Sequence, residues 1–243
     1  MPYTPNDFHS DLRQSEVFAA FLDKYFYRPM EKLIEEPCPE ATPVWFERVW
    51  GMGPQMRGTD VILHEGPWSI TIDEKAQQTY KGKLRETFVL ELSYMKNGIP
   101  CAGWLVDPRK TTTAYLFCWP KGPADKPDVY TGASLALVYS NDIIAFLNSK
   151  GYTREVLCLR EQFIRENGLR GRLESNCPDF WFAFSPHLKE MPVNVVVKED
   201  RLKKLARAVI DVEVDEKSGV SRLSGNWQQQ ILDAEVPALQ SAG

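Results

Sequence analysis

The amino-acid sequence predicts an α/β fold, because segments with strand character and segments with helix character both recur along its 243 residues. Apolar and polar residues alternate with a period of two through much of the chain between residues 57 and 119, as in strands with one buried face. Helical patterns precede and follow this region. A composition that is 43% hydrophobic and 12% aromatic is sufficient for a substantial buried core.

The first helix is expected at residues 15–27, where apolar residues fall on one side, and Pro29 is expected to end it. A proline-rich connection, 37–43, leads to the apolar tripeptide Val44-Trp45-Phe46 and then to the strands. The expected strands span residues 57–64, 69–76, 86–94, 101–106 and 112–119.

A loop is expected at residues 120–127, because glycine and prolines interrupt the pattern there. The strand predicted at 134–139 leads to a helix that begins at Asn141, a good N-cap residue, and stops at Gly151. The remaining expected elements are a helix at 153–168, strands at 180–184 and 193–197, a helix at 200–208, an alternating run at 209–214 and a polar, loosely ordered tail at 216–243.

The most informative segment is a predicted hairpin that brings two carboxylates together. Asp60 precedes the apolar run 61–63, residues 65–67 supply a turn, and the returning strand ends with Asp73-Glu74-Lys75. Because side chains alternate along a strand, Asp73 and Lys75 point to the same side, and a shift in register would turn both together.

These residue types suit metal-dependent cleavage of a phosphodiester bond. Mg²⁺ takes oxygen ligands at short range and keeps several waters, so one or two carboxylates plus phosphate oxygens can hold it. The cation makes water a stronger nucleophile and neutralises charge that develops on the phosphate. A lysine ammonium beside it can orient the water or stabilise the same charge. Asp60 and Asp73 are therefore candidate ligands, and Lys75 is a candidate catalytic residue.

The same tripeptide occurs again as Asp215-Glu216-Lys217, also after an alternating run. Upstream of this copy, Asp200 is followed by a helical pattern and not by a strand and a tight turn. Only the first copy is expected to place two acids on neighbouring strands, and the second is interpreted as a solvated strand end.

The segment Gly58-Thr59-Asp60, followed by Asp73-Glu74-Lys75 at the end of a hairpin, resembles the PD-(D/E)xK nuclease superfamily, which includes restriction endonucleases and Holliday junction resolvases. Thr59 stands where the family has proline. The resemblance covers roughly residues 10–120 and implies a restriction-endonuclease-like core with a mixed central sheet flanked by helices. A single nuclease-like α/β domain is expected over residues 1–215. The resemblance also implies Mg²⁺ as the cofactor, with Mn²⁺ as a substitute, held by Asp60 and Asp73 with Glu74 as a further candidate ligand.

The family often contributes another glutamate from a helix before the hairpin. Glu16 is the candidate for this role, and Asp23 and Glu47 compete with it. Glu91 lies in an apolar strand where a carboxylate needs a partner, since an unpaired buried charge costs several kcal/mol. Lys75, on a strand expected to be adjacent, is the proposed partner, which makes Glu91 a further candidate catalytic residue.

Two surfaces are candidates for contact with nucleic acid. Gln77 follows Lys75 on the same face of the strand and could contact substrate. The basic residues Lys203, Lys204 and Arg207 form a dense cluster on a predicted helix and are the preferred candidates for phosphate contact. A second set of arginines, between residues 154 and 172, is interleaved with glutamates and is interpreted as a salt-linked, solvated helix face.

Several function classes are disfavoured. No apolar run is long enough to cross a bilayer, and the N-terminal segment lacks the pattern of a signal peptide. Five cysteines without Cys-x-x-Cys spacing favour reduced thiols in a cytoplasmic protein. The net charge of −4 argues against non-specific coating of nucleic acid.

The leading prediction is a Mg²⁺-dependent nuclease that hydrolyses phosphodiester bonds of nucleic acid, with DNA as the favoured substrate. The alternative is a catalytically inactive binding or assembly module that keeps a nuclease-like fold, because sites and not folds determine function. A homodimer or a partner subunit is left open by the sequence.

Overall fold

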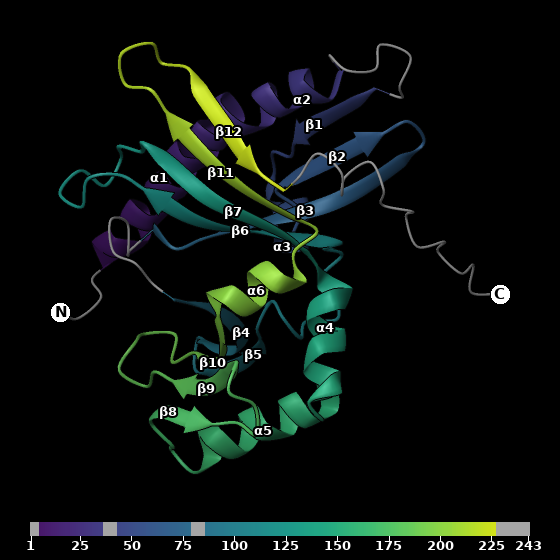
Figure 1. The fold of residues 1–243 in the computed structure, drawn as a ribbon. Helices are drawn as coiled ribbons and strands as arrows, with labels where there is room; N and C mark the ends of the chain where they lie inside the picture. Colours follow the sequence, from purple (N-terminus) through teal and green to yellow (C-terminus); the bar gives the residue numbers. More distant parts are fainter. Residues whose placement is uncertain (1–4, 36–42, 79–85, 227–243) are drawn as a thin grey trace.

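A computed structural model describes residues 5–35, 43–78 and 86–226. These residues form an α/β protein with one seven-stranded sheet, a second sheet of five strands, and helices packed against both (Figure 1).

The larger sheet is mixed and curled. Its strands are β1 (Val44–Arg48), β2 (Val61–Glu65), β3 (Trp68–Ala76), β6 (Ala114–Lys121), β7 (Gly132–Tyr139), β11 (Ala208–Val214) and β12 (Ser221–Gly225), and they lie side by side in that order. Strands β3 and β6 are parallel, whereas each of the other neighbouring pairs is antiparallel. A parallel pair needs a crossover connection, and here the chain between β3 and β6 enters the second sheet.

One face of the larger sheet is covered by a long N-terminal helix. It consists of α1 (Pro5–Leu22), a π-helical turn, η1 (Asp23–Tyr27), and α2 (Arg28–Glu35). Phe18, Leu22 and Met30 of this helix pack with sheet residues such as Ile72 and Leu116 in a buried apolar cluster. Burial of each such side chain contributes about 1.5–3 kcal/mol, and Figure 1 shows the helix lying across the back of the sheet.

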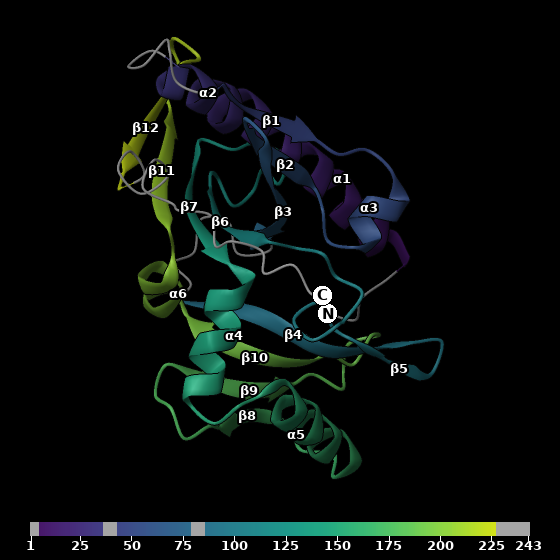
Figure 2. The ribbon, with the colours of Figure 1, turned by 90° about the vertical axis from the view of Figure 1, so that its right-hand side faces the viewer.

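The second sheet packs below the first. It consists of β5 (Ile99–Ala102), β4 (Thr87–Lys96), β10 (Val193–Lys198), β9 (Phe180–Phe184) and β8 (Gly171–Glu174), in that order. Helix α4 (Ser140–Ser149) runs from the end of β7 toward this sheet, and α5 (Arg154–Glu166) packs against β4 and β10 (Figure 2). Helix α6 (Glu199–Leu205) connects the two sheets, and α3 (Met52–Met56) precedes β2. Leu90 of β4, Phe117 of β6 and Val195 of β10 share a second apolar cluster between the sheets.

The α/β class, the mixed sheet and the hairpin of β2 and β3 are confirmed. The prediction that Pro29 ends the first helix is wrong, because the helix continues to Glu35. In a regular helix a proline leaves the carbonyl four residues earlier without a donor. The π turn directly before Pro29 changes the hydrogen-bond spacing there, since the N–H of Arg28 donates to the carbonyl of Asp23.

Four short elements were not expected: β1, α3, β8 and β12. The last of these corrects the expectation of a loosely ordered tail, because residues 221–225 pair in register with β11. The remainder of that segment, from residue 227 onward, lies outside the described residues. The strand expected at 101–106 is the shorter β5. In the described part of the chain, no helix is long and apolar enough to cross a membrane.

Candidate functional site

The site is built on the hairpin of β2 and β3. Val61 pairs with Ile72, and the backbone N–H of Asp60 donates to the carbonyl of Ile72 at 2.9 Å. Asp60 itself lies just before β2, and its Oδ2 accepts the backbone N–H of Glu74 at 2.8 Å. The carboxylate therefore occupies the position that a strand carbonyl would take, which fixes it beside β3.

Asp73 and Lys75 lie on the same side of β3, as the alternation predicts. Lys75 Nζ donates to Asp73 Oδ1 at 2.6 Å. Asp73 is only 3% exposed, and its Oδ2 has no hydrogen-bond partner among the described residues. A buried acceptor without a partner costs about 1–3 kcal/mol, and more when it is charged.

The approach of Gly58 to Asp73 requires a glycine. Gly58 has φ of +78°, and a Cβ atom there would lie 3.0 Å from Asp73 Oδ2 and 2.4 Å from the hydroxyl oxygen of Thr112. The Thr112 hydroxyl donates to the carbonyl of Gly58 at 2.8 Å. The loop that carries Asp60 is thereby held directly against Asp73.

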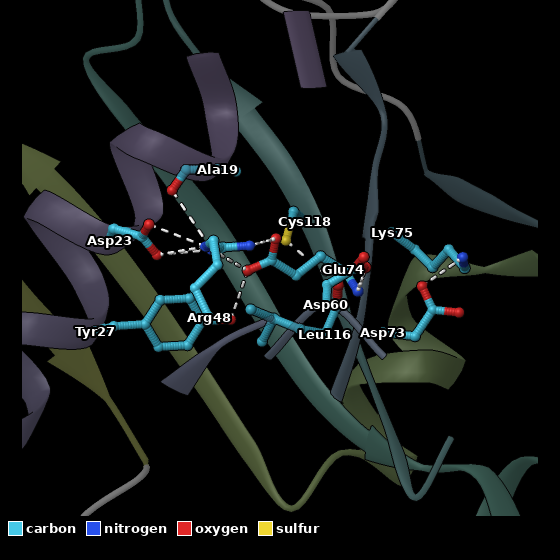
Figure 3. Close-up of polar contacts among 10 residues, drawn as sticks. All are labelled: Ala19, Asp23, Tyr27, Arg48, Asp60, Asp73, Glu74, Lys75, Leu116 and Cys118. Atoms are coloured by element: carbon cyan, nitrogen blue, oxygen red, sulfur yellow. Dashed lines mark hydrogen bonds and ion pairs between the residues drawn. The ribbon is translucent and has the colours of Figure 1, made fainter. Parts of the chain in front are cut away.

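Glu74 points to the opposite face of the sheet, toward the N-terminal helix (Figure 3). Arg48 donates to both of its carboxylate oxygens, each at 2.9 Å, and the Tyr27 hydroxyl donates to Oε1 at 2.7 Å. The other side of the Arg48 guanidinium contacts Asp23, with Nε to Oδ1 at 2.8 Å. Glu74 was a candidate metal ligand, but in this structure both of its oxygens are engaged by Arg48, and it faces away from Asp73.

The π turn supplies both Asp23 and Tyr27 to this network. The two residues lie at its two ends, where Asp23 contacts Arg48 and Tyr27 contacts Glu74. Hydrogen bonds and the charge of Glu74 raise the pKa of Arg48 although burial opposes this, and burial together with Glu74 raises the pKa of Tyr27. The Arg48 guanidinium and the Tyr27 hydroxyl therefore keep their protons. Single π-helical turns within α-helices are frequently found at functional sites.

Taken together, the cluster is short of positive charge. It contains four carboxylates and two cations, namely Asp23, Asp60, Asp73, Glu74, Arg48 and Lys75. Burial, followed by the charges of Asp73 and Glu74, raises the pKa of Asp60 to about 7. A carboxyl group in such surroundings either takes up a proton or requires a further cation.

A hollow of about 750 Å³ opens beside this cluster, and it is called here the Trp50 hollow. Its lining includes Trp50 as well as Glu16, Asp60, Glu74 and Lys75. Glu16 comes from α1 and is exposed.

The two acids that compete with Glu16 do not line this hollow. Asp23 is bound to Arg48, and Glu47 lies 3.0 Å from His64 on the outer part of the hairpin. The structure thus brings Glu16, and neither alternative, to a space shared with Asp60.

Glu91 lies near Lys75, but not through the strand pairing that was expected. Its strand, β4, belongs to the second sheet and pairs with β5 and β10, so the prediction that it neighbours β3 is wrong. Both side chains nevertheless line a second hollow, of about 710 Å³. Burial, followed by Glu190, raises the pKa of Glu91, while the charge of Lys75 acts in the opposite direction.

The residues predicted to contact nucleic acid lie outside both hollows. The Gln77 amide donates to the carbonyl of Thr87 and links the two sheets. On α6, Lys203 forms an ion pair with Glu199 at 2.6 Å. Arg207 lies just after this helix and contacts Asp142 at 3.2 Å. None of Gln77, Lys203, Lys204 and Arg207 lines either hollow.

The second copy of the tripeptide forms the turn between β11 and β12. Asp215 is exposed, and its Oδ1 accepts the backbone N–H groups of Lys217 and Ser218 at 2.8 and 2.9 Å. These hydrogen bonds lower its pKa. The interpretation of this copy as a solvated strand end is confirmed, because its carboxylate serves the turn.

The sequence reasoning missed Arg48 and Tyr27, and also Trp104, whose ring centre lies 5.1 Å from Lys75 Nζ. Arg48 is the last residue of β1 and carries a charge in a largely apolar strand, a signal that could have pointed to a buried partner. No local pattern identifies Tyr27 or Trp104, because both act through contacts with distant segments.

The described residues contain no group of three or more histidine, cysteine, aspartate or glutamate side chains arranged to hold a metal ion. The oxygen donors available are those of Asp60 and Asp73, with Glu16 across the hollow. In comparisons with protein-family models, with curated proteins and with solved structures, nothing matched this chain.

Proposed function

We propose that this protein is a Mg²⁺-dependent nuclease of the PD-(D/E)xK type that hydrolyses phosphodiester bonds of nucleic acid, DNA in the first place. The observation that carries the proposal is the charge deficit at the end of the hairpin. Asp73 is buried and has an oxygen without a hydrogen-bond partner among the described residues, and the half-buried Asp60 has a pKa of about 7.

The donor chemistry fits Mg²⁺ or Mn²⁺. Hard divalent cations bind carboxylate oxygens, and two carboxylates are sufficient when phosphate oxygens and water complete the shell. The ion would be held by Asp60 and Asp73, and would supply the two positive charges that the cluster lacks. When bound, it supplies Lewis-acid polarisation of the phosphate and a more acidic water.

Lys75 has a distinct part in this proposal. Its ammonium group holds Asp73 at 2.6 Å, and the residue lines both hollows, so a phosphate that enters either one would lie near this charged side chain. Its positive charge stabilises the negative charge that grows on the phosphate oxygens as water attacks phosphorus and the bond to the departing sugar oxygen breaks. Asp73 keeps the ammonium at that place.

Arg48 and Tyr27 would act as positioning residues. Both bind Glu74, which lies between Asp73 and Lys75 in the sequence. By holding Glu74 on one face of β3, they fix the strand where Asp73 and Lys75 project from its other face. Rigid support of this kind matters because misplacement of a reacting group by about 1 Å can lower the rate about 100-fold.

The alternative is a binding or assembly module in which the charged cluster has only a structural role. One observation favours it: Asp73 is almost completely buried beneath its ion pair with Lys75, so a cation would reach it only after the ammonium moves.

A cleavage assay separates the two functions. Plasmid DNA and single-stranded RNA are incubated with the protein and Mg²⁺ or Mn²⁺, with EDTA as the chelator control. The nuclease proposal predicts nicked or fragmented product that EDTA suppresses and that Asp73→Asn abolishes. Intact substrates under all metal conditions, with no binding of Mn²⁺ in calorimetry, would favour the binding module.

A further inference from the structure

The second hollow, lined by Lys75 and Glu91, has features that the hydrolytic step does not use. It will be called the Trp104 hollow. It lies between the end of the hairpin and the β4–β5 edge of the second sheet, and Trp104, Tyr94 and the basic residues Arg57 and Lys96 line it. Lys75 is the residue that it shares with the Trp50 hollow, so the two spaces lie on either side of the proposed site.

Trp104 is held in place by close backbone packing. Gly103 lies against β4 so tightly that a Cβ atom would come within 2.4 Å of the carbonyl oxygen of Glu91. The backbone N–H of Gly103 donates to the carbonyl of Leu92 at 2.7 Å, and the backbone N–H of Trp104 donates to the Glu91 carboxylate. The indole then lies with Lys75 Nζ 5.1 Å from its centre. An aromatic surface is thereby fixed next to the lysine of the site.

The hollow also carries an excess of positive charge. Five basic side chains line it against three acidic ones, and one of the five, Lys75, is paired with Asp73. Of the acids, Asp107 is neutralised by Arg109 at 2.8 Å. Arg57 and Lys96 have no ion-pair partner within 4.0 Å in the described part of the chain. These two cations remain available to a ligand that brings negative charge.

We infer that the Trp104 hollow is a subsite for an unpaired nucleotide next to the scissile phosphate, so that the substrate is single-stranded or has an unpaired segment at the cleavage point. The inference rests on the proposed function for the location of the scissile phosphate. Arg57 and Lys96 would contact the phosphates, and Tyr94 and Trp104 would contact the base.

The aromatic lining favours an unpaired base over an intact duplex. In a duplex the flat faces of the bases are stacked on one another, and only their edges and the phosphates are exposed. An unstacked base can place its face against an aromatic side chain, which contributes about 1–3 kcal/mol per base regardless of sequence. In the cluster Lys203, Lys204 and Arg207, by contrast, two members are already engaged. Lys203 is ion-paired with Glu199 and lies over the Trp119 ring, and Arg207 is ion-paired with Asp142 and lies over the Tyr139 ring.

The test measures binding in EDTA, so that no cleavage is needed. Fluorescence anisotropy with a labelled 12-nucleotide oligothymidine and with a blunt hairpin duplex of the same total length should give at least tenfold tighter binding of the single strand. Tyr94→Ala and Trp104→Leu should each weaken single-strand binding about tenfold. Arg57→Ala combined with Lys96→Ala should reduce the salt dependence of binding.

The matched control is Trp68→Ala, which removes an exposed tryptophan at the turn between β2 and β3, outside both hollows. It should leave binding unchanged, and thermal melts of all variants should show that Tyr94→Ala remains folded even if Trp104→Leu does not. Equal affinity for single strand and duplex, or loss of binding only on substitution of Lys203, Lys204 and Arg207, would overturn the inference.

A parallel cleavage assay with Mg²⁺ separates this inference from the proposed function. Tight, Tyr94-dependent binding of the single strand without cleavage would refute the nuclease proposal and leave the nucleotide subsite intact. Cleavage that persists in Tyr94→Ala, with unchanged affinity for the single strand, would support the nuclease proposal and refute the nucleotide subsite.

Discussion

At the scale of single residues, the protonation of Asp60 distinguishes this site from an ordinary surface ion pair. Burial and the neighbouring carboxylates raise the pKa of Asp60 to about 7 in the folded protein. In the unfolded chain, the pKa of an aspartate is about 3.9. The folded state therefore holds a proton that the unfolded state releases between these values. The resulting stabilisation is complete below about pH 4 and is lost as the pH rises through about 7.

The first prediction follows from this titration. Asp60→Asn keeps an oxygen that can accept the Glu74 N–H but removes the charge. In metal-free buffer, the melting temperature of the variant should fall less than that of the parent between pH 4 and pH 7, and the variant should be the more stable protein at pH 8. Calorimetric scans across this range measure the difference. Parallel curves for the two proteins would show that Asp60 ionises normally.

The second prediction compares the two lysines of the repeated tripeptide. Lys75→Ala should lower the cleavage rate by about 100-fold or more without loss of Mn²⁺ affinity, because the ammonium acts on transition-state charge and is not a ligand. Lys217→Ala is the matched control, since Lys217 lies in the exposed turn after β11. Single-turnover cleavage and calorimetry give the two readouts, and equal losses in both variants would contradict the assignment.

At the scale of elements, β3 and the π turn are joined through Arg48. The third prediction is that Arg48→Met destabilises the fold by about 3–5 kcal/mol, because it leaves the largely buried Glu74 without its cation. The double variant Arg48→Met with Glu74→Gln should recover part of this loss. Lys121→Met, which breaks a half-exposed pair with Asp211, should cost less than about 1 kcal/mol. Urea denaturation compares them, and equal effects would remove the structural role of Arg48.

The same elements show how far sequence reasoning reaches. Strand alternation correctly placed Asp73 and Lys75 on one side, because that relation depends only on the period of two. It could not show that β4 leaves the first sheet and pairs with β10, since a pairing between residues about a hundred positions apart has no local signature. For the same reason the strand of Glu91 was wrongly expected to neighbour β3, and the arginine that binds Glu74 was not found.

At the scale of the whole molecule, the candidate site lies where three parts of the fold meet. The N-terminal helix supplies Asp23 and Tyr27, and the hairpin of the curled sheet supplies Asp60 and Asp73. Residues of the second sheet line the Trp104 hollow together with Lys75. Charges introduced at this junction therefore act on the stability of all three parts.

The last prediction uses this coupling. A cation that binds the folded state alone stabilises it by RT ln(1 + [M]/Kd), which is about 2.7 kcal/mol at a concentration 100 times Kd. For a chain of this size, that corresponds to a rise in melting temperature of roughly 5–11 °C. Mg²⁺ or Mn²⁺ should produce such a rise at pH 7.5, EDTA should reverse it, and Asp73→Asn should abolish it.

Lys217→Ala should respond to the metal as the parent does, because its tripeptide serves only a turn. The rise should also shrink below pH 6, since a protonated Asp60 must lose its proton before it can bind a cation. A melting temperature that is indifferent to Mg²⁺ and Mn²⁺ in the parent at every pH would show that the two missing charges are not supplied by a divalent ion, and the cluster would then be a structural ion-pair network between the helix and the sheets.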